Sequence, residues 1–278
     1  MAIAVVGCSK PADPDVPVNL MTGEPEPKAS GKPFDFREKT ALLDFAYAYP
    51  ADAAALPALA AKLEGDMRDD KADALNIARQ DKQARTDNGA PFRPHEMHSK
   101  WAVTASTAGL MALLQEKYVY ADGAHGMTTY KSLVWDKQGH REIELAAMMT
   151  SPDAFSTAVR DRFCEALDAM RAQKRGAPVV RDDSAFSQCL DPINQTLALT
   201  SSDGRSIDGL AVVVAPYQAG PYAEGSYRIA LPATPAMVNA IRPEYRRAFH
   251  AVAADPPPKQ ADYMIGPVDG GIKAPSIK

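Results

Sequence analysis

The clearest hydrophobic pattern in the chain lies between Tyr118 and Leu145, which read YVYADGAHGMTTYKSLVWDKQGHREIEL. Runs of β-branched and aromatic residues alternate there with two glycine-containing polar turns, at 122–126 and 136–139. The pattern predicts three short strands joined as an antiparallel meander, at residues 118–120, 128–135 and 141–145.

Two longer segments carry apolar residues at three- and four-residue spacing, which is typical of helices that bury one face. The first follows Asp52, a predicted N-cap, and extends to about residue 85. Its apolar side is formed by Leu56, Leu59, Ala60, Leu63, Met67, Ala74, Leu75, Ile77 and Ala78. The second begins at Ser151-Pro152-Asp153 and ends near Gly176. Its stripe consists of Phe155, Val159, Phe163, Ala166, Leu167 and Met170.

Further strands are predicted on both sides of these helices, at 39–49, 101–105, 110–116, 197–199, 210–215 and 227–231, with a short helix at 235–241. The expected fold class is α+β, with antiparallel sheets, packed helices and two small α/β subdomains. The predicted subdomains span 38–115 and 116–242. A disordered tether is predicted at 9–37, because this stretch is polar and rich in proline, and a loose tail at 243–278.

Composition excludes some classes of function. The 278 residues carry a net charge of −4, so there is no basic footprint for a nucleic-acid partner. No apolar run approaches the roughly 20 residues that cross a bilayer. Nucleophile-elbow and phosphate-loop motifs are absent from the sequence. Acidic pairs such as Asp69-Asp70 and Asp182-Asp183 lie in charged runs and are interpreted as solvated surface.

Cys8 follows Ala4-Val5-Val6-Gly7 and precedes a polar, proline-rich segment. This arrangement resembles a bacterial lipobox, in which the thiol would be acylated and residues 1–8 would be a signal remnant ending at the lipidated cysteine. Acyl chains would then hold the protein on a membrane, at about 0.8 kcal/mol per buried CH₂. Only seven residues precede Cys8 and none is basic, whereas a secretory signal has a basic start and a longer apolar core. The alternative is an incidental or buried cysteine.

The other two cysteines, Cys164 and Cys189, are predicted to form a disulfide if the chain is exported. The alternative is a pair of free buried thiols in a cytosolic protein. The two interpretations of the cysteines support each other, because lipidation of Cys8 leaves an even number for pairing.

Three segments carry a family resemblance: the GAHG loop between aromatic strands, the WDKQG turn followed by EIEL, and PYQAGPYAEGSYRIALP at 216–232. Together they resemble domain of unknown function 3298. Upstream, Tyr49-Pro50 and the long helix that follows are similar to domain of unknown function 4163, also called the PdaC-type domain. The resemblance covers roughly residues 38–242. One departure is Asp122, which stands where the family often has a glycine.

The resemblance implies an envelope-facing binding module. Relatives include the extracellular part of an anti-sigma factor that binds lysozyme and the accessory region of a peptidoglycan deacetylase. It implies no catalytic site here, because the metal-binding Asp and His motifs of a deacetylase domain are not found in this sequence. The anti-sigma role does not transfer, since it needs a cytoplasmic segment and a membrane-spanning helix.

Four residues in two loops are the candidate binding residues: Asp122, His125, Tyr217 and Tyr222. Small residues beside His125 allow close approach of a partner, and imidazole both donates and accepts hydrogen bonds. Tyrosines that flank Gly220-Pro221 suit a protein interface or a surface that stacks on sugars. The alternatives are a histidine that ties its loop to the sheet and tyrosines that pack on the sheet edge.

His95 and His98 have a spacing that can share a metal on a helix, but Pro91 and Pro94 disfavour a helix there. They are interpreted as surface or loop histidines, and no metal or other cofactor is predicted. The predicted function is that of an exported, lipid-anchored lipoprotein of the periplasm or outer cell envelope. It would bind a lysozyme-like protein or peptidoglycan without catalysis. The alternative is a peptidoglycan-modifying enzyme, a deacetylase or hydrolase, or an accessory domain to one.

Overall fold

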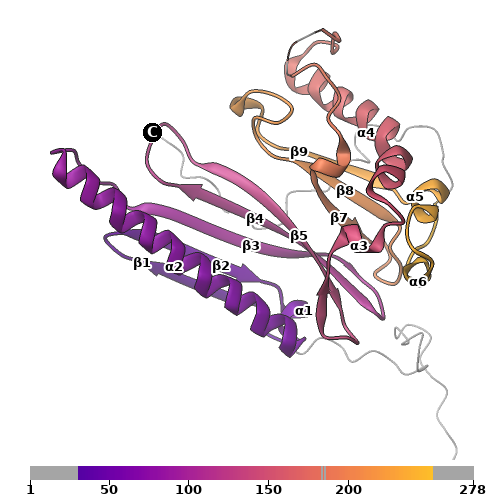
Figure 1. The fold of residues 1–278 in the computed structure, drawn as a ribbon, viewed down its shortest axis with the longest axis horizontal. Helices are drawn as coiled ribbons and strands as arrows, with labels where there is room; N and C mark the ends of the chain where they lie inside the picture. The colour runs from indigo at the N-terminus through magenta and orange to yellow at the C-terminus, as the bar shows by residue number, and fades with distance from the viewer. Residues whose placement is uncertain (1–30, 183, 185, 253–278) are drawn as a thin grey trace, which may run out of the picture.

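The computed structural model describes residues 31–252 except 183 and 185, so Cys8, the predicted signal remnant and most of the predicted tether lie outside the described residues. Within this part, strands form a six-stranded and a three-stranded sheet (Figure 1). The first sheet has the order β1 (Phe34–Lys39), β2 (Leu43–Tyr49), β3 (His95–Ser106), β4 (Leu110–Tyr120), β5 (Met127–Asp136) and β6 (Arg141–Ile143). The second has the order β7 (Thr196–Thr200), β8 (Gly209–Val214) and β9 (Tyr227–Pro232).

Neighbouring strands of the first sheet are antiparallel except β2 and β3, which are parallel. A parallel pair needs a crossover connection. Here it is formed by α1 (Ala51–Ala54) and α2 (Pro57–Asp87), and α2 lies diagonally across β1, β2 and β3 in Figure 1. The predicted meander is confirmed, because β4, β5 and β6 follow one another in antiparallel register.

Helix α2 buries Leu59, Leu63, Ala74 and Ala78. Beneath it, Trp101 Nε1 donates a hydrogen bond to the Tyr47 hydroxyl at 2.7 Å. Both of these aromatic side chains are almost completely buried, and burial raises the pKa of Tyr47.

Two local predictions for this region are wrong. Pro50 and Leu56, not Asp52, occupy the N-cap positions of α1 and α2. The Ile77 side chain is 54% exposed instead of packing on the sheet.

In the first half of β4, the side chains on both faces of the strand are apolar, because the first sheet is covered on both faces. Met111 and Leu113 belong to the core beneath α2. Leu110 and Ala112 belong to a second core, shared with the three-stranded sheet and α4 (Pro152–Arg175). The sheet therefore separates two hydrophobic cores, and the predicted boundary between residues 115 and 116 falls inside β4.

Helix α4 forms as its sequence predicts. The Ser151 hydroxyl accepts a hydrogen bond from the Ala154 amide at 3.1 Å, which satisfies one of the free amides of the first turn. Gly176 ends the helix in the left-handed conformation, with φ of 68°. The predicted apolar stripe of α4 is buried, and Phe155, Phe163 and Leu167 are fully covered.

The remaining described elements are short: α3 (Leu145–Met148), η1 (Pro192–Asn194), η2 (Tyr222–Glu224), α5 (Pro235–Asn239) and α6 (Pro243–Arg246). The fold class is α+β, as predicted. Strand β1 begins at Phe34, so the last residues of the predicted tether are paired in the sheet. Part of the predicted loose tail is also ordered, because it contains α6 and a bridge between Ile207 and Phe249. None of the described helices combines the length and hydropathy needed to cross a membrane.

Candidate functional site

The loop between β4 and β5 meets the loop between β8 and β9, and three of the four candidate binding residues come together there. The His125 imidazole stacks on the Tyr222 ring, with centroids 3.7 Å apart and planes 15° from parallel. The Tyr217 hydroxyl lies 3.1 Å from His125 Nε2, and the Tyr217 and Tyr222 rings are 5.5 Å apart. We call these three residues the aromatic cluster. His125 and Tyr217 are exposed, and Tyr222 is half-buried.

Hydrogen bonds to one carbonyl fix the cluster. The Gly126 oxygen lies 3.0 Å from His125 Nδ1 and accepts a bond from the Tyr222 hydroxyl at 2.7 Å. A carbonyl only accepts, so Nδ1 carries the hydrogen. In the neutral imidazole Nε2 is then an acceptor, and the Tyr217 hydroxyl donates to it. The three rings are therefore oriented before any ligand arrives.

Gly126 also brings the loop close to the sheet. A Cβ atom at this position would lie 2.4 Å from the Tyr118 ring, which is closer than carbon atoms approach. Tyr118, on β4, thus forms the support beneath the loop, and burial is the main reason that its pKa is raised. Only glycine fits between this ring and the aromatic cluster.

Asp122 occupies a different place from the other three candidates. Its carboxylate forms an ion pair with Arg85 of α2 and accepts hydrogen bonds from the Gly123 amide at 2.8 Å and the Tyr120 hydroxyl at 3.2 Å. The Gly123 amide, followed by the charge of Arg85, lowers the pKa of Asp122. Within the structure this carboxylate therefore holds its loop against α2.

The loop that carries the two tyrosines is held by cations from the last turns of α4. Fully buried Arg171 donates from Nε to the Ala219 carbonyl at 3.0 Å, and Arg175 donates to the same oxygen at 3.1 Å. Arg175 also pairs with Glu224 at 2.9 Å, and Lys174 donates to the Ser226 carbonyl at 2.8 Å. Burial by itself raises the pKa of Glu224, but its bonds to Arg175 and Tyr227 outweigh burial and lower it.

A disulfide joins Cys164 of α4 to Cys189, with their Cα atoms 5.5 Å apart. The segment ending at Cys189 covers Arg171, whose Nη1 donates to the Gln188 carbonyl at 2.9 Å. The disulfide therefore fixes the segment that packs over the arginine beneath the tyrosine loop.

Tyr217 has a strained backbone. Its φ is 68°, a left-handed conformation that costs most residues with a Cβ about 1–2 kcal/mol and that glycine adopts freely. Tyr217 is 45% exposed, and its side-chain contacts include those to His125 and Tyr222 in the aromatic cluster. Strain of this kind at an exposed aromatic residue is a reason to suspect a role in recognition.

His95 and His98 lie on β3, so their interpretation as surface or loop residues is wrong. His95 is buried, with Nε2 3.1 Å from Asp81, and His98 Nε2 is 3.4 Å from Asp44. His95 thus connects β3 to α2, and His98 connects β3 to its neighbouring strand β2. Among the described residues, no three His, Cys, Asp or Glu side chains form a group that could hold a metal ion.

A family model described as Deacetylase PdaC matches residues 36–128, which run from β1 into β5. Two solved structures of DUF3298 family proteins also match the chain. One is from Pseudomonas aeruginosa PAO1, with 14% identity and a TM-score of 0.48; the alignment covers 77% of this chain and 95% of that one. The other is from Bacteroides fragilis NCTC 9343, with 15% identity, a TM-score of 0.43 and the same coverage of the two chains. No curated protein matches the chain. Among these comparisons, the family match supports a PdaC-type segment at residues 36–128.

Proposed function

We propose that this protein is a non-catalytic binding module of the cell envelope and that it recognises a cell-wall glycan through the aromatic cluster. One observation carries the proposal: His125 and Tyr217, 92 residues apart in sequence, hold each other and Tyr222 in fixed contact at the surface. Aromatic side chains are large and rigid, so a recognition surface made of them loses little conformational entropy on binding.

A glycan suits the chemistry of this surface. Tyrosine and histidine combine a flat apolar face with a polar edge, and a sugar ring combines C–H faces with hydroxyl groups around its rim. Stacking would use the exposed ring of Tyr217, while its hydroxyl and the imidazole would supply hydrogen bonds. A lysozyme-like protein is the rival ligand, because tyrosine is also enriched at the energetic centres of protein interfaces.

Export of the chain is part of the proposal. The disulfide between Cys164 and Cys189 is typical of proteins from oxidising compartments, and the predicted lipid on Cys8 would hold the module at a membrane in the periplasm or outer envelope. A peptidoglycan-modifying enzyme is the alternative, favoured by the description of the family matched at 36–128.

The test is co-sedimentation of the full chain with purified peptidoglycan, in parallel with capture on immobilised c-type lysozyme. We expect retention on peptidoglycan that is lost in Tyr217→Gly and in His125→Ala. Ile77→Ala is the matched control, since Ile77 is another exposed apolar side chain, located on α2.

Equal retention of Tyr217→Gly and the unchanged protein on peptidoglycan would show that the aromatic cluster does not bind the glycan. Capture by lysozyme alone, lost in the same variants, would replace the glycan with a protein ligand. Release of acetate or of soluble fragments from peptidoglycan by the purified chain would favour the enzyme.

A further inference from the structure

Two arginines near the end of α4 join the tyrosine loop to the segment of the chain that ends at the disulfide. Arg171 donates from Nε to the Ala219 carbonyl at 3.0 Å and from Nη1 to the Gln188 carbonyl at 2.9 Å. Arg175 repeats this arrangement, because its Nη2 donates to the Ala219 carbonyl at 3.1 Å and its Nη1 to the Phe186 carbonyl at 3.2 Å. Each guanidinium therefore holds the two segments together.

The Arg171 guanidinium cannot lose an acceptor without consequence. Its side chain is fully buried, and burial lowers its pKa. Nη1 also lies 3.3 Å from Asp168, whereas Nη2 has no hydrogen-bond partner among the described residues. A buried donor without an acceptor is destabilising. If the Gln188 carbonyl moved, the guanidinium would have to follow it or turn toward water, and either movement would weaken its hydrogen bond to Ala219.

The disulfide determines where the Gln188 carbonyl lies. Gln188 directly precedes Cys189, which is bonded to Cys164, about two turns before Arg171 on α4. Both cysteines are half-buried. A dithiol would reduce the bond through a mixed disulfide, leaving two thiols on the protein and a disulfide on the reductant. Without the covalent link, Cys189 and the carbonyl beside it are free to move away from α4.

Movement of the Gln188 carbonyl reaches the aromatic cluster through Ala219. This residue is completely buried and lies two positions after Tyr217 and three before Tyr222. Its carbonyl is the atom to which both arginines donate. A looser loop would leave the two tyrosine rings without a fixed orientation, and ordering them when a ligand binds would reduce the affinity.

We propose that the disulfide between Cys164 and Cys189 is a redox switch for the aromatic cluster: the oxidised protein holds the rings ready for a ligand, and the reduced protein binds that ligand more weakly. The switch rests on the proposed function for its ligand, a cell-wall glycan, but the coupling between disulfide and loop is a property of the protein alone. Such coupling is reciprocal, so a bound glycan should make the disulfide harder to reduce by the same factor.

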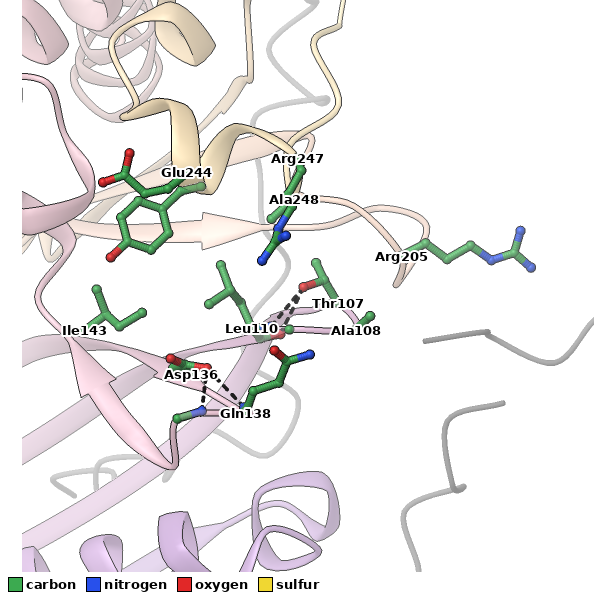
Figure 2. A pocket seen from close by; sticks show the side chains of 13 residues that line it. Thr107, Ala108, Leu110, Asp136, Gln138, Ile143, Arg205, Glu244, Arg247 and Ala248 are labelled. Atoms are coloured by element: carbon green, nitrogen blue, oxygen red, sulfur yellow. Dashed lines mark hydrogen bonds between the residues drawn. The ribbon is translucent and has the colours of Figure 1, made fainter. Parts of the chain in front are cut away.

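The test combines hydrogen–deuterium exchange with co-sedimentation on purified peptidoglycan, for the full chain before and after reduction with dithiothreitol. We expect faster exchange in residues 216–226 and an affinity for peptidoglycan that falls about tenfold, as for the loss of one hydrogen bond to a charged group. The turn at 136–139, which lines a separate cavity of about 760 Å³ (Figure 2), is the internal reference. Its Asp136 carboxylate accepts from the amides of Gln138 and Gly139 at 3.0 and 2.9 Å, and these bonds do not involve α4.

Two variants serve as controls. The double variant Cys164→Ala and Cys189→Ala should behave like the reduced protein and should not respond to dithiothreitol, which excludes an effect through Cys8. Leu63→Ala is the control for lost stability, because Leu63 is fully buried in the core beneath α2. It should leave exchange in residues 216–226 and retention on peptidoglycan unchanged. Every form is measured below its own thermal midpoint, so that only folded protein is compared.

Unchanged exchange in residues 216–226 after reduction would overturn the proposal. An equal rise in residues 136–139 would do the same, since it would indicate general loosening of the fold. Unaltered retention of the reduced protein on peptidoglycan would also overturn the switch. If the oxidised protein did not bind peptidoglycan, the proposed function would fail instead, and exchange would still decide whether the disulfide controls the loop.

Discussion

Two substitutions of Tyr217 should have different effects on stability and the same effect on the proposed glycan binding. Because its φ is 68°, Tyr217→Gly relieves backbone strain, while Tyr217→Ala keeps the strain and loses the ring. We expect the glycine variant to exceed the alanine variant in free energy of unfolding by about 1 kcal/mol, measured by urea denaturation. Both variants should lose glycan binding equally. If alanine were the more stable replacement, strain at this position would not be real.

At Gly126, in contrast to Tyr217, the native residue is already glycine and its replacement should destabilise the fold. A methyl group there would meet the Tyr118 ring, so Gly126→Ala should lower the free energy of unfolding by about 1–3 kcal/mol, the usual cost of overpacking. Gly109→Ala is the matched control, because a Cβ at Gly109 has no atom within 4 Å and no positive φ to strain it. Urea denaturation of both variants measures the difference. An equal effect of the two substitutions would mean that the loop simply moves aside.

At the same scale, Asp122 illustrates the limit of prediction from sequence. A loop aspartate beside glycine and histidine is a reasonable ligand contact, and the sequence places it near His125. Its partner, Arg85, is 37 residues away on a helix whose orientation over the sheet depends on the whole core. Local pattern carries no information about such a contact. The stacking of His125 on Tyr222 was likewise not predictable from the sequence. His125 was a candidate because of its small neighbours, and Tyr222 because tyrosine suits an interface or a surface that stacks on sugars.

Among the elements, α2 and the neighbouring strand and loop are linked by carboxylates with lowered pKa values. Asp81 bonds His95 and Arg85, and the hydrogen bond from His95 is the first cause of its lowered pKa. Because folded Asp81 and Asp122 bind protons less readily than the unfolded chain, their contribution is present above the unfolded pKa of about 4 and is lost as pH falls through the lower folded values.

We therefore expect the free energy of unfolding to fall as pH drops below about 4, measured by urea denaturation between pH 2 and 6. Asp122→Asn should reduce the slope of that decline, since asparagine tolerates the positive φ of 63° but does not titrate. A pH profile that is unchanged by the substitution would contradict the role given to this ion pair.

Helix α4 supports the tyrosine loop from below, and its last turns were only partly predicted. The stripe, the serine N-cap and Gly176 follow from local spacing, so the element itself was predictable. Cations in the last turn of a helix are ordinarily explained by the helix dipole. Nothing in the local sequence indicates that these side chains donate hydrogen bonds to carbonyls of a distant loop. Strand β1 was not predicted. Its alternation of Phe and charged residues begins directly after a proline-rich stretch, so the sequence pattern assigned its first residues to the tether.

This support can be tested through Arg175. Arg175→Met removes its bonds to Ala219 and Glu224 while keeping the length of the side chain. We expect faster hydrogen–deuterium exchange in residues 216–226, with exchange in β4 unchanged. Arg160→Met, a change on the more exposed part of the same helix, is the control. Faster exchange of both regions would indicate global destabilisation instead of a released loop.

For the whole molecule, the disulfide sets how stability depends on redox conditions. A link between residues separated by 25 positions stabilises the fold by about 3 kcal/mol in the chain-entropy model. Dithiothreitol should therefore lower the thermal midpoint of the unchanged protein. The double variant Cys164→Ala and Cys189→Ala should have a low midpoint that the reductant does not alter. A midpoint unaffected by reduction would leave the disulfide with no role in stability.

The aromatic cluster is assembled from two loops that belong to different sheets, so a fragment of the chain that lacks either loop cannot form it. The segment matched by the PdaC family model, residues 36–128, includes His125 but ends before Tyr217 and Tyr222. A protein built from that segment alone would hold one ring of three and would lack the hydroxyl that orients it. Glycan recognition as proposed would therefore need both parts of the chain. An isolated PdaC-type segment would need a partner that supplies the two missing tyrosine rings.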